Sequence, residues 1–363
     1  MKLCMAQINT LVGDIAGNAQ RVCEVSAAQR ELGADMVVFP ELTLTGYPPE
    51  DLLLRADLLD RTNAALDQLR SQLPADLIVV VGYPRAQGDA LYNSVGVIHE
   101  GQLLAEYDKQ CLPNYQVFDE KRYFHAGNKP CVVELHGLAV GLTICEDIWH
   151  AEPVAGAKAA GADILININA SPFHRGKQSE RLSRVAGCAR AHQLPILYVN
   201  QIGGQDELVF DGGSFAVDHH GELCVSAATF CEAFPMVSVD PAADSLLRKG
   251  DLIPAREELE SVWQALVLGM RDYVNKNGFP GAVLGLSGGI DSAVTLAVAV
   301  DALGPERVEA VMMPFRYTAS MSVEDAEAEA AALAVRFSII SIEPLYEGFM
   351  AALSEEFSGL SAN

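Results

Sequence analysis

A strand pattern that passes through two glycines straight into a helix is the feature that most constrains this chain. The segment 285–293 reads G-L-S-G-G-I-D-S-A, after the apolar run 282–284 and before the helix pattern of 294–300. Glycines let backbone N–H groups approach an anion closely, and a helix N-terminus adds partial positive charge. Ser287 and Ser292 add hydroxyl donors, while Asp291 is placed to hold a metal ion or to cap the helix. The segment lacks the G-K-[ST] ending of a Walker A loop, so it predicts a phosphate-binding turn of another kind.

Composition limits the class of protein and its partners. At 363 residues, half of them apolar and a fifth charged, the chain predicts a two-domain globular enzyme. Its net charge of −23 argues against nucleic acid and anionic membrane surfaces as partners. The N-terminus is too short and polar for a signal peptide, and no apolar run approaches the roughly 18 residues of a membrane span. The eight cysteines form no C-x-x-C pair, so we expect reduced thiols in a cytoplasmic protein and no protein-built metal cluster.

The first 240 residues mix hairpin-like strand pairs with βα units. Strand patterns lie at 3–8, 36–39, 77–81, 94–98, 103–107, 140–144, 164–168, 196–199, 214–217 and 223–226, and helix patterns at 18–32, 61–73, 154–160 and 179–192. This mixture predicts two sheets packed face to face with helices outside, which is an α/β sandwich.

A second unit follows a charged, proline-containing stretch. We expect domain 1 over 1–240, a linker over 241–258 and domain 2 over 259–363. In domain 2 a helix over 259–275 precedes strands at 282–286, 308–313 and 337–342, with helices over 290–303 and 322–335 between them. This βαβαβ order is part of a doubly wound parallel sheet.

Three reactive side chains follow strand patterns in domain 1. Glu41 comes after 36–39, Lys109 after 103–107, and Cys145 after 140–144. The carboxyl ends of strands are where open α/β sheets build their sites. The set suits acyl transfer, with a thiol nucleophile, a carboxylate base and an ammonium group that stabilises an oxyanion.

The sequence motifs around these residues resemble those of a known family. F-P-E-L-T-L-T-G-Y-P-P-E-D-L at 39–52, the segment 107–124, C-E-D-I-W at 145–149 and N-A-S-P-F-H-R-G-K at 169–177 resemble the nitrilase superfamily. More narrowly, they look like the glutaminase domain of glutamine-dependent NAD synthetases. The S-G-G-I-D-S string is similar to the PP-loop of ATP pyrophosphatases, and the order of the two units matches that family.

The resemblance implies roles for individual residues. Glu41 is then the base, Lys109 the oxyanion-stabilising lysine and Cys145 the nucleophile, and the glutamine contacts are Tyr115, Ser171 and Lys177. Glu120 has two open interpretations: a carboxylate that orients Lys109 or Glu41, or a surface acid paired with Arg122.

The resemblance also implies a synthetase site. ATP would adenylate deamido-NAD, with Mg²⁺ neutralising the pyrophosphate, and ammonia from glutamine would displace AMP. The matching loop residues are Leu286, Ser287, Gly288, Gly289, Ile290, Asp291, Ser292 and Ala293, and Asp291 is a candidate for holding Mg²⁺. Arg316 is either an ATP contact or a surface loop residue.

The family pattern continues beyond residue 363, with further ATP and deamido-NAD contacts. We therefore expect this chain to be C-terminally incomplete, to hydrolyse glutamine, and to make NAD poorly. A homo-oligomer is also expected from the resemblance. Two alternatives stay open: a stand-alone carbon–nitrogen hydrolase with a vestigial PP-loop unit, and a non-enzymatic nitrilase-fold subunit.

Overall fold

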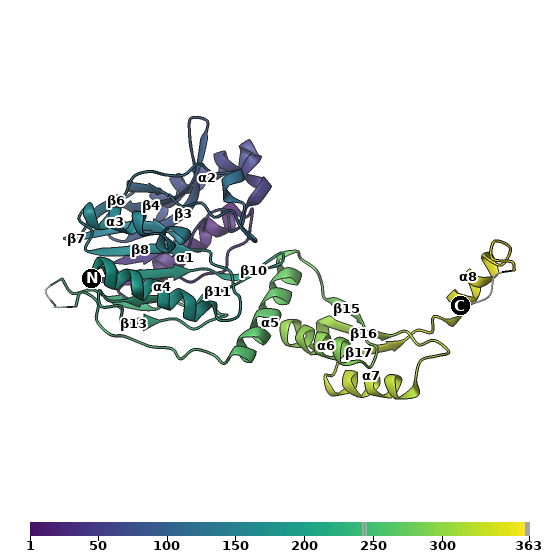
Figure 1. The fold of residues 1–363 in the computed structure, drawn as a ribbon. Coiled ribbons are helices and arrows are strands. Elements are labelled where there is room, and N and C mark those ends of the chain that lie inside the picture. The colour runs from purple at the N-terminus through teal and green to yellow at the C-terminus, as the bar shows by residue number, and fades with distance from the viewer. Residues whose placement is uncertain (242, 244, 360–363) are drawn as a thin grey trace. The chain divides into compact units, whose positions relative to one another are not determined.

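The chain forms two compact units, Met1–Ala265 and Leu266–Asn363. The computed structural model describes residues 1–241, 243 and 245–359 (Figure 1). Residues 242 and 244 of the expected linker, and 360–363 of the expected second domain, lie outside the described residues. Within the described part, no helix is long and apolar enough to cross a membrane.

Two six-stranded sheets make up most of the first unit. The first has the order β14-β1-β2-β3-β4-β5, formed by Met236–Ser238, Lys2–Met5, Met36–Val38, Ile78–Gln87, Ala90–His99 and Gln102–Asp108. The second has the order β13-β12-β9-β8-β7-β6, formed by Leu223–Ser226, Phe215–Val217, Ile196–Asn200, Ile164–Asn169, Leu138–Ile144 and Cys131–Leu135. In both sheets the central strands are parallel; hairpins form both edges of the second sheet and the β3-β4-β5 edge of the first, whose other edge strand, β14, pairs antiparallel with β1.

Strand alternation explains why the two sheets pack on each other. Along β1, Leu3 and Met5 enter a core shared with Ile166 and Ile168 of β8, whereas Cys4 enters a core on the opposite face. A strand buried on both faces reads as a continuous apolar run, as these strands do. Each fully buried aliphatic side chain contributes roughly 1.5–3 kcal/mol relative to exposure.

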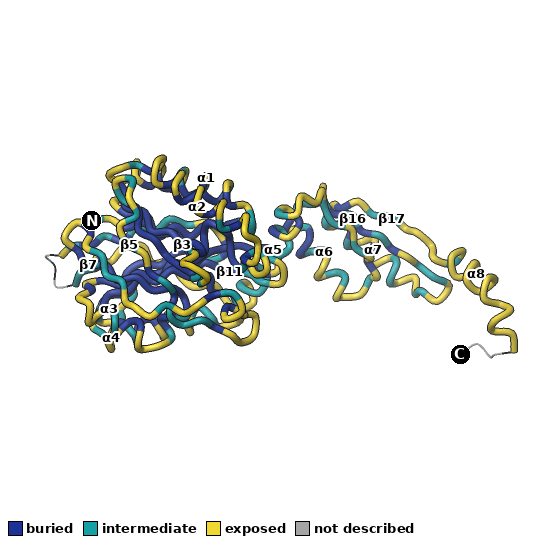
Figure 2. The backbone as a smooth tube through the Cα atoms, turned by 90° about the horizontal axis from the view of Figure 1, so that it is seen from above, coloured by how far each residue is buried: buried dark blue, intermediate teal, exposed yellow. Residues whose placement is uncertain are grey.

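Helices cover the outer faces of both sheets. Helices α1 (Ile15–Glu31) and α2 (Ala56–Gln72) pack on the first sheet, and α3 (Ala151–Ala159) and α4 (Lys177–His192) pack on the second. Figure 2 shows the centre of this unit buried, while the outward turns of α1 and α2 are exposed. The unit is therefore an αββα sandwich, and the predicted fold of domain 1 is confirmed.

The second unit contains a parallel three-stranded sheet. Its order is β15-β16-β17, formed by Ala282–Gly285, Val308–Met312 and Arg336–Ile339, with α6 (Ile290–Leu303) and α7 (Ser320–Ala332) as crossovers. Leu286, Leu296, Ala310 and Ala326 share its core. The predicted βαβαβ order is confirmed. Helix α5 (Glu258–Lys276) begins within the first unit.

Several elements differ from the sequence expectations. The expected strand 3–8 ends at Met5, because residues beyond it form only isolated bridges. Strands that the patterns did not predict are β6, β14, β10 (Ile202–Gln205) and β11 (Leu208–Asp211), and α8 (Glu343–Ala352) is a further helix. Strand β14 has three residues, and β10 contains two glycines, so neither carries a readable alternation.

Candidate active site

Cys145 stands at a sharp turn where strand β7 ends. The strand stops at Ile144 and the 3-10 helix Cys145–Trp149 begins immediately. The φ angle of Cys145 is 43°, in the left-handed region that non-glycine residues rarely adopt. A turn of this kind points a side chain away from the sheet, and it sets the thiol at the edge where strands β2, β5 and β8 also end.

Asp147 ties this turn to the segment that carries the lysine. Its fully buried carboxylate accepts from the backbone N–H of Ile144 at 3.0 Å and from that of Cys111 at 2.8 Å. The Tyr107 hydroxyl donates to it at 2.7 Å. Because Tyr107 and Cys111 flank Lys109, Asp147 fixes the position of the thiol turn relative to the ammonium group.

Lys109 lies between two carboxylates in the buried interior. Its Nζ atom is 2.7 Å from Glu41 Oε1 and 2.8 Å from Glu120 Oε1. The Tyr47 hydroxyl donates to the same Glu120 oxygen at 3.0 Å. Arg122, the alternative partner considered for Glu120, pairs instead with Asp51 at 3.1 Å. Of the two open interpretations, the geometry matches the carboxylate that orients the lysine.

Two further contacts hold the Glu41 carboxylate. Asn93 Nδ2 donates to Oε1 at 2.7 Å, and the backbone N–H of Ala170 donates to Oε2 at 2.9 Å. Both Glu41 oxygens are thereby fixed by groups from β4 and from the loop after β8. A base that is held in one orientation needs little reorganisation when it takes a proton.

Burial and charge set the protonation of this cluster. Burial alone would lower the pKa of Lys109, but Glu120 and Glu41 outweigh it and hold that pKa well above its ordinary value. Burial, reinforced by the Glu41 charge, raises the pKa of the Cys145 thiol well above its ordinary value, although Lys109 opposes this. Cys145 therefore rests as a thiol, and its attack requires a base that removes the proton during the reaction.

Glu120 provides a pH-dependent prediction. Burial raises its pKa from 4.5 to about 7, against the opposing charge of Lys109. The folded protein then binds more protons than the unfolded chain between these values, so stability falls as pH rises from about 4.5 to about 7. The amide side chain of the Glu120→Gln variant cannot titrate. We therefore expect the unfolding free energy of the variant, minus that of wild type, to increase from about pH 4.5 to about pH 7 and to stay constant above that range.

Urea unfolding of both proteins, from about pH 5 to about pH 8, measures the difference. A constant difference across that range would show that Glu120 does not titrate there. Glu355→Gln, at an exposed position near the end of the described chain, is the matched control.

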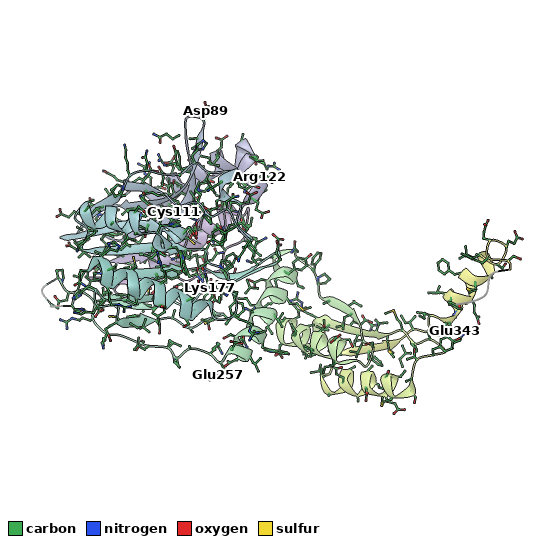
Figure 3. The ribbon with its side chains drawn as sticks, viewed as in Figure 1. Asp89, Cys111, Arg122, Lys177, Glu257 and Glu343 are labelled. Carbon is green, nitrogen blue, oxygen red and sulfur yellow. The ribbon has the colours of Figure 1, made fainter. Side chains whose placement is uncertain are left out.

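A cavity of about 250 Å³ opens over Cys145. The three residues expected to contact glutamine, Tyr115, Ser171 and Lys177, all line it. Figure 3 labels Lys177, the first residue of α4, and Cys111, which follows Lys109 by two residues. The structure thus brings together the sequence-predicted nucleophile and the sequence-predicted pocket residues.

The pocket walls carry both signs of charge. Lys177 Nζ lies 4.5 Å from the centre of the Trp149 ring and 3.2 Å from Glu180. The Tyr115 hydroxyl donates to Glu146 at 2.8 Å. Sequence reasoning missed Trp149, Glu146 and Glu180 as pocket residues, although Trp149 and Glu146 belong to the C-E-D-I-W motif.

The phosphate-loop segment of the second unit is held by its own hydroxyls. Ser287 Oγ and Ser292 Oγ are 3.0 Å apart, and the Gly289 N–H donates to Ser287 Oγ at 3.3 Å. Helix α6 begins at Ile290 with no side-chain cap, and Ser287, Gly289 and Asp291 are exposed. The N–H groups at this helix end are therefore open to an anion.

Gly288 and Gly289 differ in what they tolerate. Gly288 has a φ of +75°, and a Cβ atom there would lie 2.2 Å from the Ser322 carbonyl oxygen. At Gly289 the nearest atom to an added Cβ is Ser287 Oγ at 3.4 Å. We expect Gly288→Ala to destabilise the second unit by about 1–3 kcal/mol and Gly289→Ala to change its stability little. Thermal unfolding of the two variants measures this, and equal midpoints would contradict it.

Arg316 pairs with helix α8. Its guanidinium forms ion pairs with Glu343 and, at 3.3 Å, with Glu347. Contact between Arg316 and ATP therefore stays a prediction. Across the described residues, no cluster of three or more His, Cys, Asp or Glu side chains suited to a metal ion occurs.

Comparison with known proteins agrees with this arrangement. The carbon–nitrogen hydrolase family model matches residues 2–244, and the NAD synthase family model matches residues 262–363. The chain is 42% identical over 371 residues to the glutamine-dependent NAD(+) synthetase of Xylella fastidiosa strain Temecula1, covering 99% of this chain and 67% of the relative. It is 40% identical over 363 residues to that of Acinetobacter baylyi, covering 100% of this chain and 66% of the relative.

Solved structures show the same pattern. The glutamine-dependent NAD+ synthetase of Acinetobacter baumannii, in complex with ADP, superposes with a TM-score of 0.96 at 42% identity, covering 100% of this chain and 68% of that one. An amidase of the nitrilase superfamily from Nesterenkonia shares the fold over 65% of this chain and 89% of its own, with a TM-score of 0.59 at 22% identity.

The chain spans about two thirds of the length of the curated relatives it matches. Family models cover both of its units, in the order that these relatives have. The chain belongs to the family of glutamine-dependent NAD(+) synthetases.

Proposed function

We propose that the first unit hydrolyses the side-chain amide of glutamine through a thioester on Cys145. Glu41 takes the thiol proton as sulfur attacks the amide carbon, and the same proton then leaves with ammonia. Water, deprotonated by Glu41, attacks the thioester and releases glutamate. The observation that carries this proposal is the buried Lys109–Glu41 contact of 2.7 Å at the edge where Cys145 stands.

Lys109 stabilises the oxyanion of each tetrahedral intermediate. Two of its three N–H groups point at Glu41 and Glu120, which leaves one for the developing negative charge. In a buried site this interaction is stronger than in water, and donors of this kind typically contribute about 10²–10³-fold in rate.

The pocket walls suit an amino acid rather than a simple amide. Lys177 faces the pocket as the cation for an α-carboxylate, and Glu146, which is mostly buried, is the carboxylate for an α-ammonium group. Tyr115 and Ser171 add hydroxyls to the same walls. An amide without these charged groups would leave Lys177 and Glu146 without their ligand partners.

For the second unit we propose the use of ATP, Mg²⁺ and deamido-NAD, as the family name implies. The exposed N-terminus of α6, which has no side-chain cap, supports pyrophosphate binding, and Asp291, exposed in the first turn of α6, would hold Mg²⁺. Ammonia released at Cys145 would then form the amide of NAD. Domain limits of 1–240, 241–258 and 259–363, and assembly into a homo-oligomer, remain part of the proposal. The eight free cysteines support a reducing, cytoplasmic setting.

Substrate discrimination tests the proposal. The wild-type chain is assayed with glutamine and with butyramide, which has a similar carboxamide but neither α-substituent. We expect kcat/KM for glutamine to be at least about 10²-fold higher, because butyramide has no carboxylate for Lys177 and no ammonium group for Glu146. Equal values would contradict glutamine as the substrate.

The same assay with and without ATP, Mg²⁺ and deamido-NAD follows glutamate and NAD separately. NAD formed together with glutamate, even at the low rate expected of this chain, supports the second half of the proposal. Glutamate release with no NAD formed would favour a stand-alone carbon–nitrogen hydrolase.

A further inference from the structure

The segment 170–172 contacts the Glu41 carboxylate and also lines the pocket over Cys145. The backbone N–H of Ala170 holds Glu41 Oε2 at 2.9 Å, and the next residue, Ser171, lines the pocket over Cys145. Both residues are buried. A small displacement of this segment would move the hydrogen bond to the base and the substrate wall together.

The guanidinium group of Arg181, on helix α4, donates hydrogen bonds to this segment. Its Nη2 atom donates to the carbonyl oxygens of Ser171 at 2.7 Å and Pro172 at 3.0 Å, and its Nε atom donates to Ser171 Oγ at 3.1 Å. The side chain has no solvent exposure. Arg181, Val185 and Ala189 occupy the same buried stripe of α4, so the arginine stands where this helix otherwise buries apolar groups.

Asp211 neutralises the buried guanidinium. Its Oδ1 atom accepts from Arg181 Nη1 at 2.8 Å, and the carboxylate is itself 3% exposed. Asp211 is the last residue of β11, whereas Arg181 belongs to α4. The ion pair thus connects the β10–β11 hairpin, helix α4 and the loop after β8.

A buried ion pair is weak support for stability, since apolar residues of similar volume often serve folding equally well. The planar guanidinium offers donors in a fixed fork, which an ammonium group cannot reproduce. Three of its contacts go to one short segment, and that segment holds the base. This distribution indicates positioning rather than fold stabilisation.

We propose that Arg181, held by Asp211, is a positioning residue that fixes segment 170–172 and thereby sets both the orientation of Glu41 and the pocket wall at Ser171. Arg181 does not act on the substrate itself. The inference rests on the proposed glutamine hydrolysis, but its structural part can be measured without turnover.

Arg181→Lys is the first test, because it keeps the charge beside Asp211 and removes the fork. We expect kcat/KM for glutamine to fall by about tenfold or more, with a lower kcat and a higher KM.

Hydrogen exchange of the Ala170 and Ser171 amides gives an activity-independent result. We expect faster exchange in Arg181→Lys than in wild type. Arg190→Lys, at an exposed position in the last turn of the same helix, is the matched control and should leave exchange and kinetics unchanged.

The outcomes separate the two claims. Wild-type kinetics and wild-type exchange in Arg181→Lys would overturn the positioning role, as would a lower kcat with no change in KM or in exchange. If wild type does not hydrolyse glutamine, the proposed function fails, and exchange alone decides the positioning role. If Arg181→Lys does not fold, Asp211→Asn is measured by the same kinetics and the same hydrogen exchange. We expect changes in the same directions, and no change would contradict the positioning role.

Discussion

Cys145→Ala should abolish glutamine hydrolysis while leaving the sandwich folded. Alanine is smaller than cysteine and fits where the side chain is buried at the turn after β7. Deleting a nucleophile that forms the covalent intermediate costs about 10⁴-fold or more in kcat. Ammonia release from glutamine is measured for wild type and variant at equal protein concentrations. Circular dichroism of both proteins tests whether the sandwich stays folded.

Cys188→Ala is the control for this variant. Cys188 lies on α4, packed against the core under the second sheet, and burial raises the pKa of its thiol to about 11. We expect its hydrolysis rate to stay within about twofold of wild type, because removing its sulfur only trims apolar packing. If Cys145→Ala still released ammonia from glutamine, the nucleophile would have to be another group.

Lys109→Met should remove activity and also weaken the fold. Methionine preserves much of the side-chain volume but leaves Glu41 and Glu120 buried without their cation. Breaking a buried ion pair by removing one partner typically costs about 3–5 kcal/mol. In kcat we expect a loss of about 10²-fold or more from the missing oxyanion donor.

Unfolding in urea and steady-state hydrolysis measure the two effects separately. Lys158→Met is the matched control, because Lys158 is exposed on α3 and donates to the Gln193 carbonyl at 3.2 Å. A Lys109→Met protein as stable and as active as this control would show that the ammonium group is not the centre of the cluster.

Much of the site could be predicted because the motifs coincide with strand ends. Glu41 and Lys109 follow strands β2 and β5 of the first sheet, and Cys145 follows β7 of the second, so the packed sheets bring three strand ends to the same end of the sandwich. Their neighbours Tyr115, Ser171 and Lys177 lie in motif words and line the same cavity. For the fold, apolar runs and hairpin turns were sufficient to predict a sandwich.

The supporting residues could not be predicted for a physical reason. Asp147 follows Cys145 in a string of acids that looks like an exposed turn, and its carboxylate accepts from N–H groups of the loop after β5, which is distant in the sequence. Asn93 reaches Glu41 only through the register of β4. Arg181 is an arginine in the middle of a polar helix, and only its spacing with Val185 and Ala189 hints that it faces inward.

Acid-quenched turnover followed by peptide mass spectrometry tests the central claim most directly. Wild-type protein is mixed with saturating glutamine, quenched in acid during steady-state turnover, digested, and searched for a γ-glutamyl group on each of the eight cysteines. We predict the γ-glutamyl thioester on the peptide that contains Cys145, and on no other cysteine. The acyl group on a different residue, or no acylated cysteine while glutamate accumulates, would contradict hydrolysis through Cys145.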